Sequence, residues 1–116
     1  MRQLARIVAE RRGDVEVARI EGEVDMSNAD VLATRLRDLL TNRSVALVID
    51  LGPTTYLDSS GIRLLFGLAD ELRRRQQELH IVVPETSLLQ RVVTITGLDK
   101  ALPTHATLEA ALARAG

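Results

Sequence analysis

The sequence of 116 residues contains no cysteine, which excludes disulfides, thiolate metal sites and cysteine nucleophiles. It also lacks an apolar run of the roughly 20 residues that a membrane-spanning helix needs. Its first residues, Met1, Arg2 and Gln3, lead directly into an alternating segment without the apolar centre of a signal peptide. We therefore expect a cytoplasmic protein with no membrane insertion.

Aromatic side chains and excess positive charge are also scarce. Tyr56 and Phe66 are the only aromatic residues, so the chain has no platform for stacking bases. The formal net charge is −1, whereas nucleic-acid-binding proteins normally carry a basic excess. No P-loop, glycine-rich dinucleotide motif or metal-ligand spacing occurs. We expect no cofactor, no metal and no nucleic-acid partner.

Apolar residues, by contrast, are plentiful, and their pattern predicts an α/β fold. The chain is 46% hydrophobic, has no repeats or linkers, and fits one domain over 1–116. In order, the patterns predict a hairpin of strands 4–10 and 15–21, a helix 30–42, a strand 45–49, a loop 52–55, a helix 59–75, a strand 79–83, a helix from 87 that ends near 97, an edge strand 102–104 and a helix 107–114. This alternation indicates a mixed, mostly parallel sheet of about five strands with about four helices.

The most informative segment is YLDSSGIRLL at 56–65, which predicts a capped helix start. With Asp58 as N-cap, its carboxylate can accept from the backbone N–H groups of Ser60 or Gly61. Ser59 is then the first helical residue, and its hydroxyl lies near the positive end of the helix dipole. A phosphoryl group there would add a charge of about −1.5 to −2 that a helix N-terminus favours. The residues alone make Ser59 a competent phosphorylation site, and a plain helix start explains them as well.

Two further carboxylates are expected beside this serine. Glu23 and Asp25 follow one predicted parallel strand and Asp58 lies in the loop after the next, so all three should reach the same edge of the sheet. A dianion at Ser59 would then face any partner fitted to the neutral serine. An electrostatic penalty of about 4 kcal/mol would weaken such a complex roughly a thousandfold.

Three stretches resemble one known family. LVIDLGPTTYLDSSGIRLL at 47–65 resembles the signature region of the STAS domain of bacterial anti-sigma factor antagonists. EGEVD at 21–25 resembles a second recurrent element of that family, and LPTHATLEAAL at 102–112 resembles its usual end. The similarity covers nearly the whole chain, and the DSSG sequence is its most specific part.

This resemblance implies a partner-switching module without enzymatic activity. The unphosphorylated form would bind an anti-sigma factor that is also a GHKL-type serine kinase, and so release a sigma factor. The kinase would phosphorylate Ser59 and dissociate, and a PP2C-type phosphatase would restore the binding form. By position, Asp58, Ser60 and Gly61 would shape the site, and Glu23 and Asp25 would face or position the partner.

Three alternatives remain. Ser59 or Ser60 could form a catalytic triad with His80 or His105, although no Gly-x-Ser-x-Gly elbow is present. A phospho-aspartate receiver also gathers carboxylates at a sheet edge, but Lys100 does not directly follow a late strand as that family's lysine does. A STAS domain can also serve as a regulatory or structural subunit of a stress-signalling or lipid-transport assembly.

Overall fold

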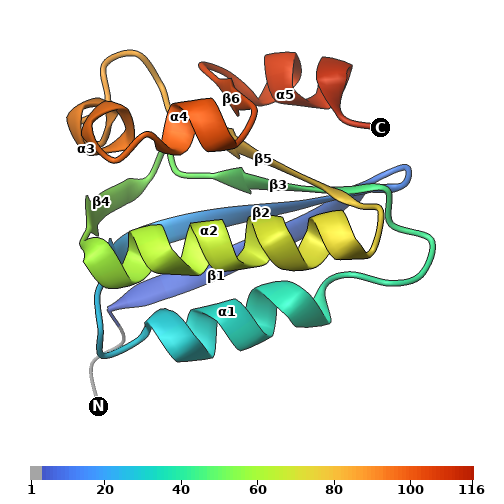
Figure 1. Ribbon diagram of the computed structural model, residues 1–116, viewed down its shortest axis with the longest axis horizontal. Helices are drawn as coiled ribbons and strands as arrows, with labels where there is room; N and C mark the ends of the chain where they lie inside the picture. Colours follow the sequence, from blue (N-terminus) through green and yellow to red (C-terminus); the bar gives the residue numbers. More distant parts are fainter. Residues whose placement is uncertain (1–3) are drawn as a thin grey trace.

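The computed structural model describes residues 4–116, which form a six-stranded sheet with helices on both faces (Figure 1). The segment Met1–Gln3, used above to predict the lack of a signal peptide, lies outside the described residues. The elements are β1 Ala5–Arg12, β2 Val15–Val24, α1 Ala29–Asp38, β3 Ala46–Asp50, β4 Thr54–Leu57, α2 Ser59–Arg74, β5 Glu78–Val82, α3 Gln90–Ile95, α4 Leu98–Ala101, β6 Thr104–His105 and α5 Leu108–Arg114. No helix within 4–116 is long and apolar enough to cross a membrane.

The sheet is mixed and mostly parallel, as the sequence predicts. Its strands lie in the order β1-β2-β3-β5-β6, and β4 pairs with β2 beyond the end of β3. Only the β1–β2 hairpin is antiparallel, because its strands are joined by the tight turn at Gly13, whereas the other described pairs are parallel. The α/β fold class is confirmed.

Two apolar layers hold the sheet between the helices. The larger lies under α1, α2, α3 and α4, and includes the fully buried Leu36, Leu65 and Leu98. The smaller lies under α5, where Val48 packs with Ala111. Strand β3 serves both layers because successive side chains of a strand point to opposite faces. Its residues Ala46 to Ile49 are all 0% exposed, which explains their uninterrupted apolar sequence.

The structure adds one strand and one helix to the predicted set. Residues Thr54–Leu57, of which 54 and 55 were placed in a loop, form β4 against the end of β2. The helix predicted to end near Gly97 is α3, and this end is confirmed, because Gly97 takes a positive φ of 75° directly after it; the short helix α4 that follows was not predicted. Both features depend on contacts with distant parts of the chain, which local patterns do not encode.

Two predicted helix bounds were also wrong. The helix expected over 30–42 ends at Asp38, because the N–H groups of Leu39 and Leu40 bond to carbonyls only three residues back and so tighten the last turn. The helix expected from Ser87 begins at Gln90, since the Ser87 hydroxyl accepts from the N–H of Leu89 and closes a turn before the helix.

Candidate functional site

Strand β2 holds the two loops of the candidate site, the one after β2 and the one after β4, next to each other. In the parallel β2–β4 pair, Glu23 lies opposite Tyr56 and Val24 opposite Leu57. The ladder extends one step further, because the Asp58 N–H donates to the Val24 carbonyl at 3.3 Å. Asp25 and Asp58 therefore leave the same edge of the sheet at adjacent positions, as the topology argument predicts.

The irregular start of this pairing requires a glycine at position 22. Gly22 has φ of 108°, and a Cβ there would lie 2.2 Å from the Leu4 carbonyl oxygen. Its N–H donates to the Pro53 carbonyl, while the next N–H, of Glu23, turns the other way and donates to Leu4. The register shifts between these two residues, which aligns β4 after β3 has ended.

Asp58 caps α2 as the sequence predicts. Its Oδ1 accepts from the N–H of Ser60 at 2.8 Å and from that of Gly61 at 3.3 Å. The flanking residues Leu57 and Ile62 are both buried in the main core, the arrangement of a hydrophobic staple. Cap and staple together fix where the helix begins and the direction in which it leaves the sheet.

The three residues after the cap have distinct surroundings. Ser59 is exposed at the first helical position, Ser60 is half-buried, and Gly61 is buried. A Cβ on Gly61 would lie 2.3 Å from Leu57 Cδ1 and 3.1 Å from Val24 Cγ1, so this position admits no side chain without rearrangement. The Ser59 hydroxyl is therefore exposed at the N-terminus of α2, while the buried side of this first turn packs tightly against Leu57 and Val24.

The turn after β2 is built on Asp25. Its Oδ1 accepts from both the N–H and the hydroxyl of Ser27, and these bonds lower the pKa of Asp25 below its ordinary value. Asn28 completes the turn, because its side chain accepts from the Asp25 N–H and donates to the Glu23 carbonyl. Asp25 is thus a charged residue that organises the turn, whereas the Glu23 side chain is exposed.

Sequence reasoning missed a groove beside this edge. It has a volume of about 400 Å³, lies between α1 and α2, and is lined by Met26, Arg37, Ser60, Arg63 and Leu64 among others. Met26 at its end is 82% exposed, and Tyr56 at the neighbouring strand end is 48% exposed. Exposed Met and Tyr side chains are typical of protein interfaces. In the sequence, the apolar Met26 among the polar residues of the β2–α1 turn is the one feature that could have indicated this surface.

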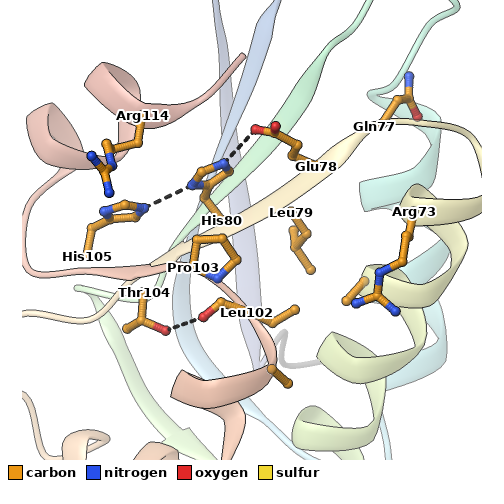
Figure 2. Close-up of a pocket in the computed structure, with 12 residues that line it drawn as sticks. Arg73, Gln77, Glu78, Leu79, His80, Leu102, Pro103, Thr104, His105 and Arg114 are labelled. Atoms are coloured by element: carbon orange, nitrogen blue, oxygen red, sulfur yellow. Dashed lines mark hydrogen bonds and ion pairs between the residues drawn. The ribbon is translucent and has the colours of Figure 1, made fainter.

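Both histidines lie on the other face of the sheet from α2, so the serine–histidine triad is not formed. His80, on the α5 side, is only 3% exposed, and its Nδ1 lies 2.9 Å from His105 Nε2 (Figure 2). Its Nε2 lies 2.9 Å from the Glu78 carboxylate. Lys100 is exposed on α4, so it does not supply the lysine of a receiver site. Within 4–116, no three acidic or histidine side chains are gathered where they could hold a metal ion.

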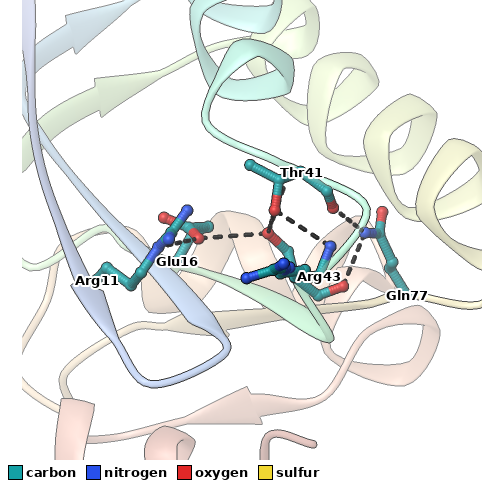
Figure 3. Close-up of polar contacts among 6 residues, drawn as sticks. Arg11, Glu16, Thr41, Arg43 and Gln77 are labelled. Carbon is teal, nitrogen blue, oxygen red and sulfur yellow. Dashed lines mark hydrogen bonds and ion pairs between the residues drawn. The ribbon is translucent and has the colours of Figure 1, made fainter.

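A buried polar network at the opposite edge of the sheet has a structural role. Glu16, 6% exposed, accepts from Arg11 at 2.9 Å and from the Ser44 hydroxyl at 3.3 Å (Figure 3). The Gln77 amide nitrogen donates to the carbonyls of Thr41 and Ser44. These bonds tie the α1–β3 connection to the hairpin and to the end of α2, which explains why polar side chains are buried there.

Comparisons with known proteins agree with this geometry. The model of the STAS domain family matches residues 6–111. The anti-sigma-F factor antagonist RsfB of Mycobacterium tuberculosis is 32% identical over 105 residues, which cover 90% of this chain and 84% of that protein. An anti-sigma-B factor antagonist of Listeria monocytogenes is 32% identical over 80 residues, covering 69% of each chain. The crystal structure of an anti-sigma factor antagonist from Mycobacterium paratuberculosis superposes with a TM-score of 0.84 at 29% identity, covering 96% of this chain and 93% of that one.

The family match extends over nearly all of the strands and helices that place Ser59, from β1 into α5. Together with the capped serine after β4 and the confirmed α/β topology, it leads to one conclusion: the chain belongs to the STAS domain family.

Proposed function

We propose that this protein is an anti-sigma factor antagonist controlled by phosphorylation of Ser59. In its unphosphorylated form it binds an anti-sigma factor that is also a GHKL-type serine kinase, and thereby releases a sigma factor in the cytoplasm. The kinase transfers a phosphoryl group to Ser59 and the complex dissociates. A PP2C-type phosphatase then removes the group. The observation that carries the proposal is the exposed Ser59 hydroxyl at the capped start of α2.

The fold can accept the added charge at this position. The first turn of α2 contains no acidic side chain, so the phosphate would meet the positive end of the helix dipole, with the Asp58 cap as the like charge directly before it. Arg63 lies four residues on, at the spacing that brings side chains together on a helix surface. We expect the phosphorylated domain to be as stable as the unmodified one.

The partner would meet a changed surface. The groove between α1 and α2, which Ser60 lines next to Ser59, and the exposed Met26 and Tyr56 offer a mixed polar and apolar contact area beside Ser59. At the adjoining strand ends, Glu23, Asp25 and Asp58 would add negative charge to this area, and Ser60 and Gly61 shape the helix start beside Ser59. A dianion placed there must be desolvated or repelled by a partner fitted to a hydroxyl, and penalties of this kind reach several kcal/mol. The proposed switch therefore acts on binding and leaves folding intact.

The test uses the purified protein with its cognate kinase and ATP, followed by mass spectrometry and by calorimetric measurement of binding. Ser59→Ala should incorporate no phosphate and keep its affinity for the kinase. Ser59→Asp should bind at least tenfold more weakly, with its melting temperature unchanged. Ser60→Ala, which removes the neighbouring hydroxyl, is the matched control and should still be phosphorylated at position 59.

Two results would contradict the proposal. Phosphate that persists on Ser59→Ala would refute the site, and equal affinity of the phosphorylated and unmodified proteins would refute the charge mechanism. If the protein is instead recovered in a stable assembly that contains no kinase, this would support the alternative role as a regulatory STAS subunit.

A further inference from the structure

A second cavity lies at the other end of α2, about 20 Å along the helix from Ser59. It forms where β6 stops short. This two-residue strand pairs only with Ile81 and Val82, so the first half of β5 has no strand on that side within residues 4–116. The preceding Pro103 has no N–H with which to extend the ladder. The resulting cavity has a volume of about 580 Å³, within the range of small-molecule sites.

The lining of this cavity combines an apolar floor with cationic walls. Leu79, Leu102 and Pro103 form part of the floor. Arg73 of α2 lies on one side, and His105 of β6 with Arg114 of α5 on the other (Figure 2). Glu78 and His80 of β5 complete the ionisable groups, and α4 contributes only apolar residues. Arg73 is paired with Asp70 at 3.2 Å and Glu78 is bonded to His80, so among the described residues Arg114 supplies the unpaired positive charge of the lining.

A chain of hydrogen bonds fixes the protons of the two histidines. The Glu78 carboxylate accepts from the N–H of Gly116, and it can only accept from His80, so His80 Nε2 carries a hydrogen. When His80 carries this single hydrogen, its Nδ1 accepts from His105 Nε2 at 2.9 Å. This assignment, made from the bonding pattern, leaves His105 Nδ1 as the free nitrogen of the pair.

Among the described residues, no carboxylate lines the cavity at its His105 end. Figure 2 shows the Arg114 guanidinium next to the His105 ring, and Arg114 makes no ion pair among the described residues. Burial and the positive charge of Arg114 lower the pKa of His105, and protonation of His80 would lower it further. Glu78 is engaged by His80 and Gly116 at the opposite end of the chain of bonds. An anion at His105 would offset the repulsion and allow Nδ1 to take up a proton and donate it in a hydrogen bond.

We propose that this cavity binds a small organic anion. Its anionic group, a sulfonate, phosphate or carboxylate, is held by the Arg114 guanidinium and by protonated His105 Nδ1, and its apolar body lies over Leu79 and Leu102. Arg73, which is paired with Asp70, lines the far wall. The site is separate from Ser59, so its occupancy and the proposed phosphorylation can be tested independently.

Benzenesulfonate is a suitable probe, because its charge stays constant between pH 5 and pH 8. The chain has only two histidines, so their ring C–H signals in NMR spectra report on this cavity alone. We expect both signals to shift saturably with benzenesulfonate, and the affinity to rise when the pH is lowered from 7.5 to 5.5. Arg114→Met should weaken binding about tenfold, the usual contribution of a charge-assisted hydrogen bond.

Arg74→Met is the matched control, since it removes the same charge from an exposed residue that does not line the cavity. It should leave the affinity unchanged. The proposal is overturned if the shifts grow linearly without saturation, if the two variants weaken binding equally, or if the affinity is the same at both pH values. The remaining signals of each spectrum verify that the variants are folded.

Discussion

Gly61→Ala tests whether the packing behind Ser59 is as tight as the structure shows. The new Cβ would lie 2.3 Å from Leu57 Cδ1 and 3.1 Å from Val24 Cγ1. These neighbours are 7% and 2% exposed, so neither has free space into which to move. Overpacking of this kind costs about 1–3 kcal/mol. Alanine recovers about 0.5–1 kcal/mol through its greater helix propensity. The net expectation is a loss of about 1–2 kcal/mol in the free energy of unfolding.

Thermal unfolding followed by circular dichroism can resolve this loss. For a domain of this length, 1 kcal/mol corresponds to roughly 4 °C, so Gly61→Ala should melt about 4–8 °C below the wild type. Gly67→Ala is the matched control in the same helix, because no atom lies within 4 Å of its added Cβ. It should gain about 0.5–1 kcal/mol and melt about 2–4 °C higher.

A Gly61→Ala variant that melts at or above the wild-type temperature, in step with Gly67→Ala, would refute this reasoning. A second measurement locates the clash. In a Leu57→Ala background the nearest atoms are gone, so adding Gly61→Ala should cost less than it does in the wild type. Equal costs in the two backgrounds would show that Leu57 is not the obstacle.

Three further predictions concern Asp58, Gly22 and His105. Asp58→Ala removes the acceptor of two N–H groups and should lower the free energy of unfolding by about 1 kcal/mol in urea titrations, whereas Asp70→Ala, on the exposed side of the same helix, should change it by less than half as much. Gly22→Ala should lower it by more than about 2 kcal/mol and more than Gly61→Ala does, because its obstacle is the Leu4 backbone and its φ is positive; a smaller loss would contradict the close approach. Because the pKa of His105 is lowered on folding, the unfolded chain takes up this proton first, so stability should fall as the pH drops through 6.5 toward the folded value, and His105→Gln should flatten that part of a pH series.

The residues around Ser59 could be predicted from the sequence because their contacts are local. Asp58 bonds to N–H groups two and three residues away, and the spacing of cap and staple is a property of any helix start. Their position next to Asp25 was also predictable, since parallel strands deliver their ends to one edge. Local chemistry plus one rule of topology was sufficient for this part.

The rest depends on contacts between distant segments. Strand β4 exists only because β2 extends beyond the end of β3, and no pattern within Thr54–Leu57 records that length difference. The groove between α1 and α2 and the cavity at His105 arise from how helices and a short edge strand pack. The contact between His80 and His105 joins residues 25 positions apart, and their separate patterns gave no reason to pair them.

The long strand β2 has two successive neighbours on one side, β3 and then β4. The spacing between the Asp25 turn and Ser59 is consequently set by main-chain bonds, from Gly22 to Pro53 and from Asp58 to Val24. Main-chain hydrogen bonds do not depend on the identity of most side chains. Met26 and Tyr56 can therefore be replaced by other residues without moving Ser59 relative to its surroundings. A lineage of such proteins could thus diverge in what it recognises while each member keeps the hydroxyl in register with the same frame.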